Sequence, residues 1–187
     1  MSRYTEKLIL QSFGEMLQEM PFDKITVSAL TRRSDVSHNT FYYRYHDIFD
    51  LLKVWIRMET APYLAQDRLY PDWETSVAAM LKSWQKDSVR IYHIYHSASR
   101  SELERCVFEQ LEGFFYAQVR CFPEAETIPD KQLKRISDVA CYIFLGFLSR
   151  FLWGGMELDV DESVHELTVL LKGFLRHAIA DARDAAE

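Results

Sequence analysis

A run of eight residues, 37–44, concentrates side chains suited to specific hydrogen bonding. Phe41 and Tyr45 are four residues apart, so in a helix they share one face and turn toward a core. The other positions then face outward and carry imidazole, amide, hydroxyl and guanidinium groups: His38, Asn39, Thr40, Tyr42, Tyr43 and Arg44. These groups donate and accept hydrogen bonds, so the chemistry that they offer is recognition of a polar surface.

Two short helical patterns position these side chains. The first begins at Thr26, whose hydroxyl can cap a free backbone N–H, and it places Val27 and Leu30 on one face. The second begins at Ser37, another favourable N-cap. Only residues 34–37 separate the two patterns. This arrangement is typical of a helix-turn-helix, which indicates DNA as the recognised surface.

Further helical patterns surround this motif. An amphipathic stretch runs from residue 3 to about 20, where Pro21 ends it, and Asp47 can cap a fourth helix with Asp50 in a capping-box position. Later patterns lie near 73–86, 88–96, 101–121, 130–153 and 162–182. Pro62 and Pro71 bracket the expected domain boundary.

These patterns predict an all-α protein of about nine helices. We expect an N-terminal three-helix helix-turn-helix domain over residues 1–58, which includes the start of a linking helix, and a C-terminal helical bundle for regulation and dimerisation over residues 59–187. Apolar residues make up 48% of the 187 residues, with six Gly and five Pro. That composition favours packed helices over disorder or a β-sandwich.

The charge is unevenly distributed. The net charge is −6, yet residues 1–59 hold eight basic and eight acidic residues, whereas residues 60–187 hold fourteen and twenty. Within residues 26–46 three arginines face one aspartate. This weak basic patch predicts modest electrostatic affinity for DNA, so two copies on each site would help.

The cysteines and apolar segments favour a cytoplasmic protein without a membrane anchor. Cys106, Cys121 and Cys141 show no CxxC spacing, which fits a reduced compartment. The N-terminus lacks the apolar stretch of a signal peptide. The most apolar segment, residues 139–148, is interrupted by Ser149 and Arg150 and is too short to cross a bilayer.

No catalytic or cofactor motif is present in the sequence: it has no GxSxG, P-loop, HExxH or GxGxxG. We therefore predict no enzymatic activity and no cofactor. His93 and His96 are three residues apart and could share a helical face as metal ligands, but no third ligand is near, so half-buried histidines are favoured over a metal site.

Aromatic residues of the C-terminal part are candidates for the wall of an effector pocket, because such walls favour flat apolar ligands. The candidates are Trp84, Tyr92, Tyr95, Phe108, Phe115 and Tyr142. Aromatic residues at helical spacing also occur in ordinary cores, and this alternative stays open.

The last two helical patterns predict a homodimer. Residues 139–148 are apolar all round, which in a soluble protein means burial from several sides. The apolar stripe of the final pattern is too wide for one neighbouring helix. Two such helices from each of two chains would form a four-helix interface, and Gly146 would permit close approach.

The N-terminal 55 residues or so resemble the DNA-binding domain of the TetR family of bacterial transcriptional repressors. The resemblance is carried by the run TVSALTRRSDVSHNTFYYRYHDIFDLL, in which the matching positions are Thr26, Val27, Leu30, Val36, Ser37, Thr40, Phe41, Tyr42, Tyr45, Asp47 and Leu51. It implies a TetR-like fold.

The resemblance also implies roles for the polar residues. Ser37, Thr40 and Tyr42 would bind phosphates, whereas His38, Asn39 and Tyr43 would face base edges, where the Asn39 amide is suited to adenine. Thr26, Ser28 and Arg33 are expected to contact the DNA backbone beside the groove.

Three positions depart from the family pattern. Asp35 stands in the turn where Gly is usual, and Asp tolerates a left-handed backbone better than most residues. Arg44 replaces His or Tyr, and we expect it to contact a phosphate or a base. Ile48 replaces a Lys that in the family meets a phosphate, which should lower the salt slope of DNA binding by about one unit.

A second likeness lies in GFLSRFLWGGMELDVDE, residues 146–162, which resembles the C-terminal region of a TetR subgroup common in Gram-positive bacteria. Some members of that subgroup act with protein partners. The sequence thus predicts a dimeric repressor on a palindromic double-stranded DNA site, whose affinity is modulated through the C-terminal domain by a small-molecule or protein effector. The alternatives are a co-regulator whose C-terminal domain binds a protein, and an enzyme on a helical scaffold.

Overall fold

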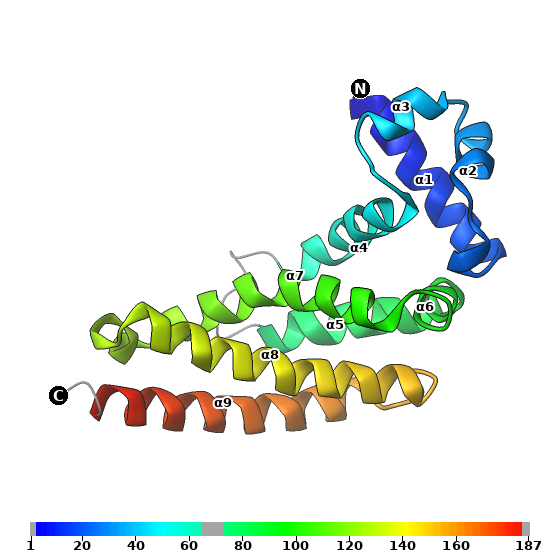
Figure 1. Cartoon of the computed structure of the whole chain (residues 1–187). Helices are drawn as coiled ribbons and strands as arrows, with labels where there is room; N and C mark the ends of the chain where they lie inside the picture. The colour runs from blue at the N-terminus through cyan, green and yellow to red at the C-terminus, as the bar shows by residue number, and fades with distance from the viewer. Residues whose placement is uncertain (1–2, 65–72, 185–187) are drawn as a thin grey trace. The chain divides into compact units, whose positions relative to one another are not determined.

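The structure, a computed structural model, describes residues 3–64 and 73–184, and within these ranges it is all-α with no strand (Figure 1). Nine α-helices lie in the described ranges: α1 (Arg3–Glu19), α2 (Val27–Arg33), α3 (His38–Tyr42), α4 (Ile48–Leu64), α5 (Trp73–Lys86), α6 (Ser88–Tyr95), α7 (Arg100–Arg120), α8 (Asp130–Trp153) and α9 (Val160–Asp184). Short 3-10 turns cover η1 (Phe22–Lys24) and η3 (Pro123–Thr127). The predicted fold class is confirmed.

The helix bounds follow the hydrophobic patterns closely, with one difference. The bounds of α5 and α8 coincide with the predicted ranges 73–86 and 130–153. Pro62 does not end a helix, because it lies inside α4, which continues to Leu64. Pro71, the other predicted boundary signal, lies outside the described residues.

The chain forms two compact units. The first comprises residues 1–60 and 87–103, and the second comprises residues 61–86 and 104–187. The first unit thus contains α6, which packs on α1 although the helices before and after it belong wholly or mainly to the second unit. The functional division at residues 58 and 59 stays a prediction, and the assignment of α6 is a packing result that local periodicity does not reveal.

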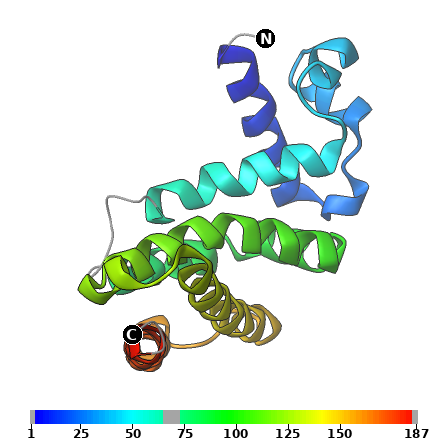
Figure 2. The ribbon, with the colours of Figure 1, turned by 60° about the vertical axis from the view of Figure 1, so that its left-hand side comes forward.

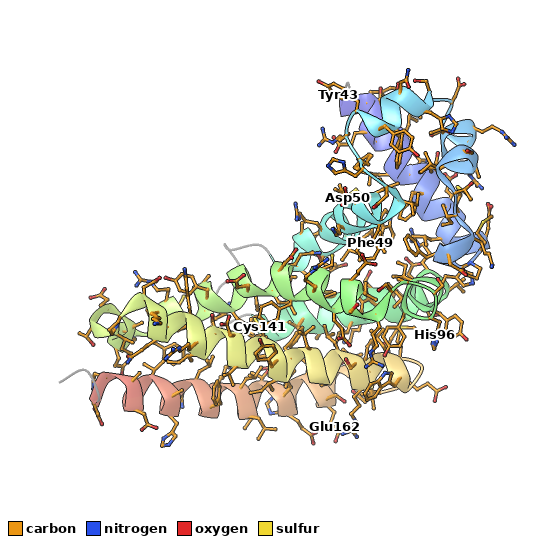
Figure 3. The ribbon with its side chains drawn as sticks, viewed as in Figure 1. Tyr43, Phe49, Asp50, His96, Cys141 and Glu162 are labelled. Atoms are coloured by element: carbon orange, nitrogen blue, oxygen red, sulfur yellow. The ribbon has the colours of Figure 1, made fainter. Side chains whose placement is uncertain are left out.

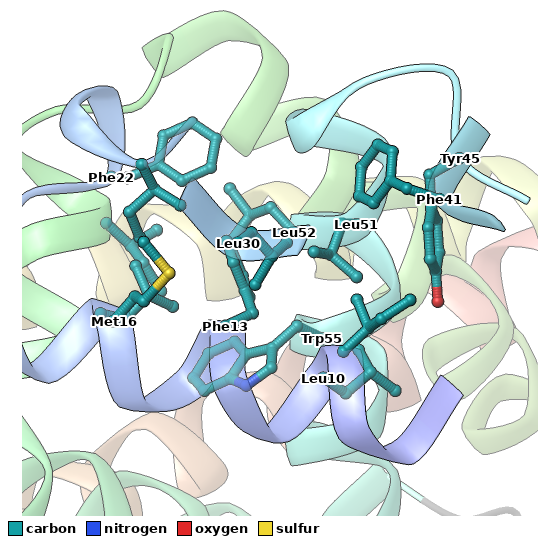
Figure 4. Packing of buried hydrophobic residues seen from close by; sticks show 14 residues of the cluster. Leu10, Phe13, Met16, Phe22, Leu30, Phe41, Tyr45, Leu51, Leu52 and Trp55 are labelled. Carbon is teal, nitrogen blue, oxygen red and sulfur yellow. The ribbon is translucent and has the colours of Figure 1, made fainter. Parts of the chain in front are cut away.

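The core of the first unit joins α1 to α4 (Figure 4). Phe13, Leu30, Phe41 and Leu51 are fully buried, and the ring of Tyr45 lies 5.3 Å from that of Phe41. The predicted core positions of Phe41 and Tyr45 are therefore confirmed. Burying a side chain of this size contributes roughly 1.5–3 kcal/mol, so this core fixes the faces that α2 and α3 expose.

In the second unit, α8 and α9 run side by side, and α9 also packs against α5 (Figure 1). By length and composition alone, α8 is the one helix in the described ranges that could cross a membrane. It buries Leu133, Phe144 and Phe151 within its own unit and carries Lys131 and Lys134 at its start. Helices that pack within a bundle satisfy the same criteria, so the length and composition of α8 do not establish a membrane span.

The turn between α8 and α9 is fixed by a side chain from α5. Gly155 and Met156 have positive φ values of 68° and 63°, which reverse the chain. The Gln85 amide donates to the carbonyl oxygens of Met156 at 2.7 Å and Leu158 at 3.2 Å. These bonds tie the turn to α5 and give two carbonyl oxygens of the turn a donor.

We expect Gln85→Ala to lower the free energy of unfolding by about 1–2 kcal/mol, because two half-buried carbonyl oxygens lose their donor. Urea unfolding followed by circular dichroism measures this change. Lys86→Ala alters the exposed neighbouring residue and serves as the control. Equal stabilities of the two variants would contradict the assigned role of Gln85.

Candidate nucleic-acid interface

Side-chain caps start both helices of the motif. Thr26 Oγ1 accepts a hydrogen bond from the Ala29 N–H at 3.2 Å, and Ser37 Oγ accepts one from the Thr40 N–H at 3.1 Å. Both predicted N-caps are confirmed. The helices α2 and α3 lie side by side (Figure 1, Figure 2). Each cap satisfies an orphan donor, so these short helices start at defined residues.

The turn between the helices accommodates Asp35 in the left-handed region. Its φ is 53°, and the Val36 N–H reaches back to the Thr31 carbonyl oxygen at 3.0 Å. The Ser34 N–H donates to the Leu30 carbonyl oxygen at 2.9 Å, which continues the helical hydrogen bonding of α2 by one residue. The turn therefore forms with Asp in the place where the family pattern has Gly, as expected.

We expect Asp35→Gly to raise the stability of the first unit by up to about 1 kcal/mol, because Gly adopts a positive φ without the steric cost of a Cβ. Asp35→Ala removes the same carboxylate while keeping the Cβ, so it should lower stability. Thermal unfolding of the two variants separates these effects. A more stable alanine variant would show that charge, and not backbone geometry, governs the position.

The outward face of α3 is polar. His38, Asn39 and Arg44 are exposed, and the exposed fractions of Tyr42 and Tyr43 are 56% and 80%. Figure 3 shows Tyr43 projecting from the end of α3. Phe41 and Tyr45 point into the core, so the recognition groups and the packing groups occupy different faces.

Two hydrogen bonds order this face. Ser28 Oγ lies 3.1 Å from His38 Nε2, which links α2 to α3. Ser37 Oγ lies 2.8 Å from Thr40 Oγ1 in addition to its capping bond. The structure thus brings four of the predicted DNA-contact residues together, with Ser28 and His38 as one pair and Ser37 and Thr40 as the other.

The arginines of the interface have carboxylate partners on α1. Arg33 Nη1 lies 2.6 Å from Glu19, and Arg33 Nη2 lies 3.3 Å from Glu15. Arg44 Nη2 lies 2.6 Å from Glu6. The hydrogen bond from Arg33 lowers the pKa of Glu19 and raises that of Arg33, so both stay charged at neutral pH. Sequence reasoning missed these three glutamates, since only the fold brings α1 to α2 and α3.

Asp47 caps the start of α4 as predicted, whereas Asp50 accepts from the residue before the cap and does not close the expected capping box. Asp47 Oδ1 accepts from the backbone N–H groups of Phe49 and Asp50, each at 2.8 Å. Asp50 Oδ2 accepts in return from the His46 N–H at 3.2 Å. These bonds hold the chain that follows α3. The side chain of Ile48, at the first position of α4, offers no cation for a phosphate.

The six aromatic pocket candidates do not all fall in one compact unit. Tyr92 and Tyr95 belong to α6 in the first unit, whereas the other four belong to the second. In the second unit the rings of Phe108 and Tyr142 lie 5.2 Å apart, and Phe115 is buried. Trp84 is half-buried. The effector pocket stays a prediction.

The histidine pair has other contacts. His93 Nδ1 lies 2.7 Å from the Leu17 carbonyl oxygen, and the His96 ring lies 4.1 Å from the Tyr92 ring. His93 is half-buried, as the alternative to a metal site predicted, whereas His96 is exposed. In the part of the chain that the structure describes, no group of three His, Cys, Asp or Glu residues is arranged to hold a metal ion.

Solved structures share this fold. The TetR transcriptional regulator from Streptococcus agalactiae 2603V aligns with a TM-score of 0.62 at 20% identity, over 90% of this chain and 94% of that one. The TetR family repressor AlkX from Dietzia sp. strain DQ12-45-1b, implicated in biodegradation of n-alkanes, aligns with a TM-score of 0.53 at 14% identity, over 91% and 97%. The dihydroxyacetone kinase operon activator DhaS aligns with a TM-score of 0.55 at 15% identity, over 97% and 98%. At these identities the likeness establishes the fold.

Sequence comparison establishes the family. No curated protein matches the chain significantly. A family model of TetR C-terminal regions, described as "Transcriptional regulator C-terminal region", matches residues 71–173, which is more than half of the 187 residues. The resemblance at the N-terminus and this match at the C-terminus agree, and the chain belongs to the TetR family of transcriptional regulators.

Proposed function

We propose that this protein is a cytoplasmic repressor that binds a palindromic DNA operator as a homodimer, with α3 of each subunit in the major groove. The observation that carries the proposal is the division of α3 into two faces. Phe41 anchors the helix in the core, while Asn39 and Tyr43 are exposed beside it. A surface helix of this kind, positioned by a capped partner helix, suits groove recognition.

The proposed roles follow the exposed groups. Asn39 reads a base edge through its paired donor and acceptor, and His38 and Tyr43 read neighbouring positions. Phosphate contacts come from Ser37, Thr40 and Tyr42, with additional backbone contacts from Thr26, Ser28, Arg33 and Arg44. The Ser28–His38 hydrogen bond supports this assignment, since it restricts the imidazole that would face the groove.

An exposed apolar stripe supports the dimer. Val139, Tyr142 and Ile143 are exposed on α8, and Val169 and Leu170 are exposed on α9. The exposed positions on α8 are three and four residues apart and therefore share one side of the helix. A Cβ added at Gly146 or Gly173 would meet no atom within 4 Å. Pairing these helices with their copies would bury the stripe in a four-helix interface.

Regulation is proposed to act through the C-terminal part of the chain. An effector or a partner bound by residues 59–187 would change the separation of the two α3 helices, provided that it binds one spacing better than the other. Members of the TetR family are transcription factors, and we propose that this chain regulates without catalysing a reaction. The structures similar to this chain include both a repressor and an activator, so a transcription assay is needed to distinguish repression from activation.

Selection of bound fragments from genomic DNA tests this proposal. The full-length protein is expected to enrich a palindrome, to protect two successive major grooves in a footprint, and to lower transcription in vitro from a promoter that overlaps the site. Candidate effectors are then added to the same assays. Failure to enrich any fragment would refute the proposal, and increased transcription would refute the repressor assignment.

A further inference from the structure

Two of the three arginines of the motif are neutralised by carboxylates of the protein itself. Arg33 donates to both oxygens of Glu19, at 2.6 and 2.7 Å, and also to Glu15 Oε2 from Nη2 at 3.3 Å and from Nε at 3.4 Å. Arg44, which directly follows the α3 C-cap, pairs with Glu6 at 2.6 Å. All three carboxylates project from α1, so one helix supplies every counter-charge.

These pairs change the local charge that DNA would meet. Arg33 with two carboxylates amounts to a net charge of −1, and Arg44 with Glu6 amounts to zero. Arg32, the remaining arginine of the motif, is exposed near the end of α2. Non-specific DNA affinity comes almost entirely from cations that neutralise phosphates, so this surface is poorly charged for it.

The pairs are also accessible. The side chains of Arg33 and Glu19 are 35% and 50% exposed, and those of Arg44 and Glu6 are 48% and 21% exposed. Exposed ion pairs contribute little to stability because water screens them, so a phosphate can displace a carboxylate at little cost. An arginine held in this way is available to DNA, but only in competition with its own protein.

We propose that Glu6, Glu15 and Glu19 are specificity-determining residues that compete with DNA phosphates for Arg33 and Arg44. By weakening the sequence-independent attraction, they make stable binding depend on the base contacts of α3. The ratio of specific to non-specific affinity, which decides occupancy in a genome, rises as a result. This inference rests on the proposed function, since it assumes that this face meets DNA.

The test compares full-length variants on a duplex of random sequence by fluorescence anisotropy at several KCl concentrations. Glu6→Gln and the double variant Glu15→Gln/Glu19→Gln are each expected to bind about 3- to 10-fold more tightly at low salt, with a salt slope steeper by about one unit for each released arginine. Glu102→Gln removes one carboxylate, as Glu6→Gln does, from an exposed position in the same compact unit and should change little. Affinities of the α1 variants equal to that of Glu102→Gln, or lower than wild type, would overturn the inference.

A double-mutant cycle isolates the arginine. Arg33→Ala should weaken binding more in the Glu15→Gln/Glu19→Gln background than in the wild type, because only the released side chain reaches a phosphate. Equal losses of DNA affinity in the two backgrounds would show that Glu15 and Glu19 do not compete with DNA for Arg33. Circular dichroism confirms that each variant is folded. The proposed function would fail if the wild type enriched no genomic fragment. The inference alone would fail if the wild type enriched an operator but the glutamine variants bound random DNA no more tightly than the wild type.

Discussion

Asn39→Ala is expected to abolish selective binding to the enriched operator while leaving the dimer folded and non-specific affinity unchanged. A side chain that donates to and accepts from one base contributes about 1–3 kcal/mol of discrimination. The operator engages two copies, so the loss is doubled, and the affinity for the selected site falls on the order of 100-fold or more. The Asn39 side chain is exposed, so its removal leaves the core intact. Footprinting and anisotropy on operator and random duplexes measure the effect.

Gln18→Ala is the matched control for this variant, because it removes an exposed amide from α1 whose partner, Asp87, lies outside the proposed groove contact. It should preserve the footprint. A footprint that persists with Asn39→Ala would remove this residue from base recognition. Equal losses of affinity on operator and random duplexes would show that Asn39 contacts the DNA backbone instead, since phosphate contacts carry no sequence information.

Local signals in the sequence were sufficient for the geometry of the motif. Thr26, Ser37 and Asp47 each precede an apolar pattern, and each caps a helix through its own side chain. Such bonds join residues two or three positions apart, so no knowledge of the fold is needed to predict them. The core positions of Phe41 and Tyr45 follow in the same way from their spacing.

Contacts between distant segments were not predictable from these signals. Arg33 meets Glu15 across 18 positions, and Gln85 meets Met156 across 71. The sequence separation of these residues does not identify them as contacts, because a long polar side chain at an exposed position can pair with many partners. Arg33 was expected to be available for the DNA backbone, and the fold places it against α1.

The packing of α6 shows the same limit. Its residues continue the helical patterns of the second unit in sequence, yet His93 Nδ1 lies 2.7 Å from the Leu17 carbonyl oxygen, and Gln18 bonds to Asp87 at 2.6 Å. Periodicity indicates that a helix buries a face but does not say against which neighbour. The place of residues 87–103 in the first unit therefore follows from contacts between distant segments and not from the local pattern.

Leu170→Glu is expected to convert the dimer to a monomer and to reduce operator affinity on the order of 1000-fold, the largest effect among the variants. Leu170 is 71% exposed in the single chain, on the apolar stripe that also includes Val169. At a two-fold interface the substitution occurs twice, so two carboxylates would be buried without partners, at several kcal/mol each. Sedimentation should show a species of one chain, 22.1 kDa, in place of twice that mass.

Val89→Glu tests whether any new carboxylate on an exposed apolar residue has this effect. Val89 lies on α6 and is 47% exposed, outside the proposed interface, so this variant should remain dimeric and bind the operator.

The mass and the operator affinity of Leu170→Glu should change together. A monomer keeps its folded first unit and each base contact of one half-site, but it loses the second half-site that the dimer held at high effective concentration. Non-specific binding by the monomer should therefore persist while operator binding fails. A Leu170→Glu protein that sediments as a dimer would exclude the α8 and α9 stripe as the interface, whereas a monomer with full operator affinity would show that one copy of α3 suffices.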